Sequence, residues 1–234
     1  MRLILPFCIY LLSCSFSYGQ DDIIYFTDAL KKHLKPYYIK SEKQLRQGDY
    51  AEADVSFDSL VEHHLIGSRF TDYTLKNVNG GRVKLSKVKK PVLLLTYASW
   101  CVMGKGEIPA INKLSKKYSK DVQIVVIFWD KKHRIKKLAR KFRGNVKVCY
   151  ASEAYLNDAR VVATLKNTLG LPTSYLLNAD LDVVDIHRGG LSTDIKLTYI
   201  EALNLAYESL ESRLKRKSLI QQSTHTQLAV QTTN

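Results

Sequence analysis

Cys101 is the residue whose position in the sequence is most typical of a reactive group. The chain has four cysteines, and Cys101 and Cys149 are the two that lie beyond its first 19 residues. Cys101 follows an apolar strand pattern at 92–97 and precedes a helical pattern that starts at 104. The start of a helix offers unpaired N–H groups and a positive dipole end, both of which favour the nucleophilic thiolate. The sequence therefore predicts Cys101 as a catalytic thiol, with a small buried core cysteine as the alternative.

Cys149 belongs to a separate short apolar segment, 146–150, that is typical of a strand. Free cysteines are often buried in such segments. Cys149 could also be the resolving cysteine for Cys101, which would require their Cα atoms to lie within about 7 Å. The sequence leaves both roles open.

Strand and helix patterns alternate along the part of the chain that surrounds these cysteines. Alternation of this kind predicts an α/β fold with a largely parallel sheet, and the last two strands predict an antiparallel edge. After a hairpin within 70–85, the expected strands are 92–97, 122–129, 146–150, 174–177 and 182–186. The expected helices are 104–118, 131–143, 158–169 and a last one capped by Ser192.

Residues 20–66 read as a helical hairpin extension that precedes the main domain. Its first helix is expected to be interrupted at Pro36, and a Gly-Asp turn at 48–49 leads into a second helix over 50–64. His63 and His64 are adjacent and so face different sides of a helix, with no acidic or cysteine cluster beside them. The sequence therefore predicts no metal and no other cofactor.

The two ends of the chain differ in composition from the main domain, 67–217. Arg2, an apolar run and then small or polar residues up to Gly19 are typical of a secretory signal peptide over 1–19, and the run is too short to span a membrane. Cleavage near Gly19 fits the pattern better than lipid attachment at Cys14. We expect export to the periplasm or cell envelope. Residues 218–234 have no charged side chain and are expected to form a disordered tail.

Two segments carry a family resemblance. The first is Tyr-Ala-Ser-Trp-Cys-Val-Met-Gly-Lys-Gly-Glu-Ile-Pro at 97–109, and the second is Gly-Leu-Pro-Thr-Ser-Tyr-Leu-Leu at 170–177. They resemble the active-site segment and the Gly-Val-Pro-Thr-Thr-Phe-Leu-Ile segment of TlpA/ResA-like thiol-disulfide oxidoreductases, exported proteins of bacterial envelopes. The resemblance implies a thioredoxin fold, a central mixed β-sheet flanked by helices. The matching positions of the first segment are Trp100, Cys101, Lys105, Glu107 and Pro109.

The resemblance also implies how a substrate would dock. The family's proline is cis and faces the active-site cysteine, so Pro172 is expected to present the backbone of Leu171 to a partner segment, with Trp100 beside it. Lys105, Glu107 and Pro109 are expected to support the site. The expected partner is a cysteine-containing envelope protein or a low-molecular-weight thiol.

Three positions depart from the family's pattern. Gly104 replaces the second cysteine, so Cys101 cannot resolve a mixed disulfide within the motif. Leu95 occupies the position of a buried acid or Asn in many relatives, and Val-Met at 102–103 replaces a common Pro-Pro. Two hypotheses remain: a monothiol oxidoreductase that forms mixed disulfides through Cys101, or a redox-inactive thioredoxin-fold binding module.

A peroxide-reducing site of the peroxiredoxin type is a further possibility for this fold. Its pattern resembles Pro-x-x-x-Thr-x-x-Cys, and here Leu94 and Ala98 hold the Pro and Thr positions. Without the hydroxyl that positions peroxide, the sequence argues against this activity.

The chain is basic, with a net charge of +14, and 131–143 contains eight Lys and Arg and no acid. Apolar residues recur there at helical spacing, so the cations should share the opposite face. This face could contact an acidic partner or lipid headgroups, or be merely solvated. Export, and the lack of interleaved aromatic residues, argue against a nucleic-acid partner.

Overall fold

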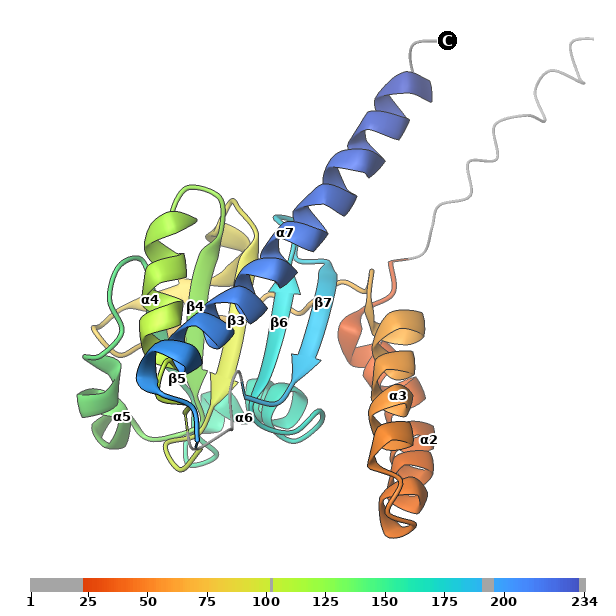
Figure 1. Cartoon of the computed structure of the whole chain (residues 1–234), viewed down its shortest axis with the longest axis horizontal. Coiled ribbons are helices and arrows are strands. Elements are labelled where there is room, and N and C mark those ends of the chain that lie inside the picture. Colours follow the sequence, from red (N-terminus) through yellow and green to blue (C-terminus); the bar gives the residue numbers. More distant parts are fainter. Residues whose placement is uncertain (1–22, 102, 191–195, 232–234) are drawn as a thin grey trace, which may run out of the picture.

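The computed structural model describes residues 23–101, 103–190 and 196–231. The predicted signal peptide and the helix cap expected at Ser192 lie outside these ranges. The described residues form a seven-stranded sheet in the order β2-β1-β5-β4-β3-β6-β7 (Figure 1). The strands are β1 (Thr74–Asn77), β2 (Arg82–Lys84), β3 (Val92–Tyr97), β4 (Gln123–Phe128), β5 (Lys147–Tyr150), β6 (Thr173–Leu177) and β7 (Val183–Arg188).

The centre of the sheet is parallel and its margins are antiparallel. β3, β4 and β5 run in the same direction, whereas β1 is antiparallel to β5, and β6 is antiparallel to both β3 and β7. Every residue of β3 and β4 is buried. Both strands are apolar apart from Thr96 and Gln123, as is typical of strands that helices cover on both faces.

The helices divide between the two faces of the sheet. α4 (Glu107–Lys117), α5 (Lys132–Ala139) and α7 (Tyr199–Gln231) cover one face, which we call the α4 face. α2 (Phe26–Arg46), α3 (Tyr50–Leu60) and α6 (Ala159–Val161) belong with the other, the α2 face. Short π-helical turns form η1 (Val61–Leu65) and η4 (Val162–Lys166), and short 3-10 turns form η2 (Leu85–Lys87) and η3 (Leu156–Asp158). The predicted α/β architecture, with a mixed sheet and an N-terminal helical hairpin, is confirmed.

The helical hairpin is continuous with the core of the α2 face. Phe26 has no exposed surface, and its ring centroid lies 5.2 Å from that of Phe70 and 5.9 Å from that of Tyr175 in β6. Backbone bonds join the same segments, since the N–H of Phe26 donates to the carbonyl of Arg69 at 2.9 Å. The first turn of α2 thus packs directly onto the sheet.

The predicted interruption at Pro36 is wrong, because α2 runs unbroken from Phe26 to Arg46. Pro36 removes one helical N–H donor and so frees the carbonyl of Lys32. Both residues are exposed, so water can satisfy that carbonyl and the helix continues. The predicted second helix does begin after the Gly-Asp turn, where the Asp49 side chain accepts from the N–H of Glu52 at 3.1 Å.

Two helix boundaries differ from the sequence prediction. α4 begins at Glu107 rather than at 104, so the segment after Cys101 is a loop. α7 extends to Gln231, past residue 217, where the sequence predicted the start of a disordered tail. Within the described residues, no helix combines the length and the apolar character that crossing a membrane would require.

Candidate functional site

Strand register brings the two motif segments to the same edge of the sheet. β3 and β6 are antiparallel with Thr96 opposite Thr173, so the end of β3 lies beside the start of β6. The Thr96 hydroxyl donates to the Thr173 carbonyl at 2.8 Å and accepts from the Thr173 N–H at 3.1 Å. The Leu171–Pro172 peptide immediately before β6 is cis, which confirms that expectation. The Cys101 loop and Pro172 therefore leave neighbouring strands at the same edge.

Cys101 lies half-buried in a tight turn that follows β3. The Cys101 N–H donates to the Ala98 carbonyl at 2.9 Å, and the Ala98 N–H points back at the Cys101 sulfur at 3.3 Å. The expectation that Cys101 begins a helix is wrong, because α4 starts only at Glu107. An N–H directed at sulfur can stabilise developing negative charge. In this structure that donor comes from the turn itself.

Asp130 fixes this turn from the neighbouring strand. Its carboxylate is buried and accepts from both the N–H and the hydroxyl of Ser99, each at 2.6 Å. The sequence analysis missed both residues. The available signal was that Asp130 follows a buried strand parallel to β3, since parallel strands end at the same edge of a sheet.

Glu107, which the family resemblance implied as a supporting residue, joins the end of β3 to the start of α4. Its buried carboxylate accepts from the Tyr97 hydroxyl at 2.6 Å and from the Gly104 N–H at 3.0 Å. Burial, and next the Glu107 charge, hold the pKa of Tyr97 well above its usual value, so Tyr97 remains a donor. Gly104 lacks a thiol, but its backbone helps to hold the loop.

The loop also packs against the C-terminal helix. Gly106 is buried so closely on α7 that a Cβ atom there would lie 2.2 Å from the backbone nitrogen of Leu203. No larger residue fits unless α7 moves.

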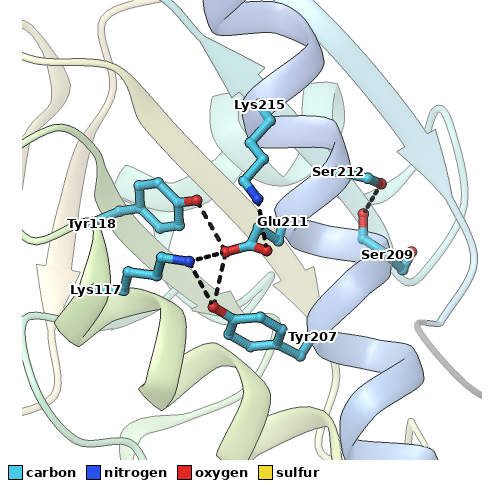
Figure 2. A network of polar contacts seen from close by, with 7 residues as sticks. All are labelled: Lys117, Tyr118, Tyr207, Ser209, Glu211, Ser212 and Lys215. Atoms are coloured by element: carbon cyan, nitrogen blue, oxygen red, sulfur yellow. Dashed lines mark hydrogen bonds and ion pairs between the residues drawn. The ribbon is translucent and has the colours of Figure 1, made fainter.

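Near the C-terminal end of α4, the Glu211 carboxylate of α7 accepts hydrogen bonds from four side chains (Figure 2). The donors are the side chains of Lys117, Tyr118, Tyr207 and Lys215. We call these five residues the Glu211 cluster. The bond from Lys117, and next that from Tyr207, lower the pKa of Glu211 to about 2. The cluster fixes α7 against α4, whose first turn carries Glu107.

The residues expected to dock a substrate are at least partly accessible. Trp100 beside the thiol is 72% exposed, which is unusual for so large an apolar side chain. Leu171 and Pro172 are half-buried. Lys105 is exposed, and Pro109 is half-buried in the first turn of α4. An exposed aromatic ring next to an accessible thiol can contact a bound polypeptide.

The structure does not bring Cys149 to Cys101, and both thiols are free. Cys149 is fully buried in β5 among the apolar residues of the α2 face, whereas Cys101 packs against the core of the α4 face. Burial raises the pKa of Cys149 to about 12. Leu95 is also buried on the α4 face. Cys149 is therefore placed as a core residue, and not as a partner for Cys101.

His63 and His64 are the side chains that the sequence analysis weighed as metal ligands. The His33 and His64 rings stack with their centroids 3.7 Å apart, and the His63 ring lies 6.4 Å from that of His64. Across the described ranges, no group of three or more His, Cys, Asp or Glu residues is arranged to hold a metal ion.

Comparison with known proteins identifies the class. The model of the AhpC/TSA family matches residues 66–186, just over half of the chain, and the protein belongs to this family. With the mixed sheet, this confirms the predicted thioredoxin fold and the kinship with thioredoxin-like thiol-disulfide oxidoreductases.

Two relatives from Bacillus subtilis illustrate the kinship. Thioredoxin-like protein YneN is 28% identical over 127 residues, which cover 54% of this chain and 73% of YneN. Thiol-disulfide oxidoreductase ResA is 26% identical over 140 residues, covering 58% of this chain and 75% of ResA. Among solved structures, a Chlorobium tepidum protein provisionally described as thiol:disulfide interchange protein DsbE is 25% identical, with a TM-score of 0.49. The match covers 65% of this chain and 96% of that one.

Proposed function

We propose that this protein is an exported monothiol oxidoreductase that forms mixed disulfides through Cys101. The observation that carries the proposal is the half-buried thiol, with an N–H directed at its sulfur, at the same sheet edge as the cis Leu171–Pro172 peptide. The relatives named above include one thiol-disulfide oxidoreductase and one thioredoxin-like protein, in keeping with such an activity.

The chemistry is an exchange of one disulfide for another. The Cys101 thiolate attacks one sulfur of a partner disulfide, a new S–S bond joins Cys101 to that sulfur, and the other partner sulfur leaves as a thiolate that takes a proton from water. A second thiolate then attacks the partner sulfur and returns Cys101 as a thiolate. Neither Gly104 nor the buried Cys149 can supply that thiolate. The partner's own second cysteine or a low-molecular-weight thiol must do so.

Partner docking would use the residues around the thiol. The Pro172 carbonyl accepts from the Gly189 N–H at 2.8 Å, so β7 holds the proline segment in place. A partner strand would pair with the backbone of Leu171 and pack on Trp100. The partner is a cysteine-containing protein of the envelope or a small thiol.

Export is part of the proposal and is supported by the sequence of residues 1–19. Their basic, apolar and then small-residue pattern is that of a cleaved signal peptide. The corresponding location is the periplasm or cell envelope. Lipid attachment at Cys14 is the alternative to release after cleavage near Gly19.

The test is capture of a disulfide probe by a protein whose only thiol is Cys101. The variant Cys8→Ser/Cys14→Ser/Cys149→Ser is mixed with a peptide whose cysteine is linked to thionitrobenzoate, and released chromophore and adduct mass are measured. We expect one adduct per chain from the Cys101-only protein, and no adduct after Cys101→Ser. An unreactive Cys101 in the folded protein would overturn the proposal.

A binding module without redox activity is the second candidate. Gly104 and Leu95 favour it, because each takes the place of a residue with redox or proton-transfer chemistry in relatives. This function predicts a partner that co-purifies equally well with the Cys101→Ser variant and is not released by reductant.

A further inference from the structure

A groove opens beside Cys101, between the start of α4 and the end of α5. Its volume is about 470 Å³, and Cys101 lies within its lining. The apolar side chains in the lining are Met103, Ile108, Pro109 and Leu138, and the cationic ones are Lys105 and Lys141. The reactive thiol, an apolar surface and two cations therefore share one depression.

Asn112 holds the α5 side of this groove in place. Its side-chain amide donates to the Lys141 carbonyl at 2.9 Å, and its oxygen accepts from the Arg143 N–H at 2.7 Å. Asn112 lies in α4 and itself lines the groove. Because both bonds join α4 to the segment after α5, the groove is a fixed feature of the fold.

The groove continues onto a strongly positive surface. All eight Lys and Arg side chains of 131–143 are exposed. Of the four apolar residues at helical spacing, Ile135, Ala139 and Phe142 are buried and Leu138 is half-buried. In the part of the chain that the structure describes, none of the eight belongs to an ion pair. Like charges gathered in this way repel one another and attract an anionic ligand.

We propose that this groove binds an acidic polypeptide segment that carries the cysteine attacked by Cys101. The proposal rests on the proposed function, and it specifies the substrate class. The partner's apolar side chains would lie on Ile108 and Leu138, and its carboxylates would pair with Lys105, Lys141 and the exposed cations of α5. The groove lies on the α4 side of Cys101, so it adds to docking at Leu171 and Pro172.

The extent of the charge favours a polypeptide over a small acidic thiol or a lipid surface. α5 alone is about 12 Å long at 1.5 Å per residue, so its cations reach beyond any molecule confined to the groove. A lipid surface would meet the cations but has no disulfide for attack by the Cys101 thiolate, which lines the same groove. A polypeptide can satisfy both features at once.

The experiment compares exchange rates with three short peptides. They are identical except that glutamate, glutamine or lysine flanks a central cysteine linked to thionitrobenzoate. The protein is the full chain with Cys101 as its only thiol. We expect the glutamate peptide to react about tenfold faster than the glutamine peptide at low salt, because complementary charge raises the rate of encounter. The lysine peptide should be slowest, and the difference should vanish near 1 M salt, where the Debye length is about 3 Å.

Matched variants locate the effect. Arg140→Gln/Lys141→Gln should move the glutamate-to-glutamine rate ratio toward one. Lys87→Gln/Lys89→Gln removes the same charge from exposed residues before β3, at the opposite edge of the sheet from Cys101, and should keep the ratio.

The outcomes separate this proposal from the function on which it rests. Equal rates for all three peptides, or a ratio unchanged by Arg140→Gln/Lys141→Gln, would overturn the acidic substrate class while leaving exchange at Cys101 intact. If no peptide reacts, affinities are measured with serine in place of the peptide cysteine. Preference for the acidic peptide that depends on Arg140 and Lys141 would then support the groove and refute the thiol chemistry.

Two further results would also overturn the proposal. One is a small dicarboxylate disulfide that reacts as fast as the glutamate peptide and depends on the same residues. The other is tight binding to phosphatidylglycerol vesicles that depends on Arg140 and Lys141, together with equal rates for the three peptides.

Discussion

Cys101 and Cys149 are both free thiols, but they differ in solvent exposure and in their place relative to the sheet. Cys101 lies in a turn beyond the end of β3, half-exposed, with an N–H directed at its sulfur. Cys149 lies within β5, with no exposed surface and with a pKa raised to about 12 by burial. They belong to different faces of the sheet. Position beyond the strand end, and not the number of cysteines, is what distinguishes a candidate nucleophile in this chain.

The largest expected difference between the two thiols is in alkylation rate. At pH 8 a thiol with a pKa of about 12 is ionised in only ~1 molecule in 10,000, and Cys149 is also buried. We expect Cys101 to react at least about a thousandfold faster than Cys149 in the folded protein. Peptide mass spectrometry after timed labelling measures both. Comparable alkylation rates of Cys101 and Cys149 without denaturant would contradict the assignment of Cys149 as a protected core residue.

Removing Asp130 should destabilise the turn that carries Cys101 and leave the surroundings of Cys149 unchanged. Asp130→Ala takes away both acceptors of Ser99 and is expected to cost about 2 kcal/mol of the free energy of unfolding, as for hydrogen bonds to a charged group. Exchange at Cys101 should slow while Cys149 stays protected. Denaturant titration and labelling measure the two effects. Ser99→Ala, which removes only the hydroxyl bond, should cost less; an equal loss would mean that the backbone bond contributes nothing.

Restoring the second cysteine should shorten the life of the mixed disulfide. In Gly104→Cys the new thiol can attack the bond between Cys101 and its partner, which the natural chain cannot do within the motif. We expect adducts to decay about tenfold faster or more, with a disulfide between residues 101 and 104 as the product. Adduct mass against time provides the measurement, with Gly104→Ser as the control. If adduct lifetime is unchanged, the loop does not bring position 104 to the sulfur.

The smallest expected effect concerns the Glu211 cluster. The folded-state pKa of Glu211, about 2, lies below its ordinary value of 4.5, so the cluster stabilises the protein above pH 4.5 and loses this contribution between about pH 5 and 2. Glu211→Gln should lower Tm by about 2–4 °C at pH 7, the shift that ~1 kcal/mol produces in a chain of this size. Thermal melts of both proteins should converge toward pH 2. A constant difference at every pH would contradict an ionic origin.

Much of this structure was predictable because it depends on local patterns. The largely apolar segments that form β3 and β4 predicted central strands. The helical spacing of Ile135, Ala139 and Phe142 predicted the buried side of the basic segment. The resemblance at 170–177 implied the cis peptide before Thr173. Each of these features is encoded within a few consecutive residues.

The remaining features depend on contacts between distant parts of the chain. Asp130 bonds to Ser99 across 31 positions, and strand order determines that Cys149 and Cys101 belong to opposite faces. The sequence predicted that α4 starts at 104, but the helix begins at Glu107. The Glu107 carboxylate accepts from the Gly104 N–H, and the residues before Glu107 form a loop. The predicted helix interruption at Pro36 was wrong because the sequence did not show that Pro36 lies on the exposed side of α2.

Phe26 has a consequence for how the molecule folds. Its ring lies between Phe70 and Tyr175 with no exposed surface, so the boundary at residue 66 cuts through a continuous apolar core. A fragment starting at 67 would open a cavity against β6 and expose aromatic surface to water. The hairpin and the sheet should therefore melt in a single cooperative transition, and the N-terminal helices are not a detachable module.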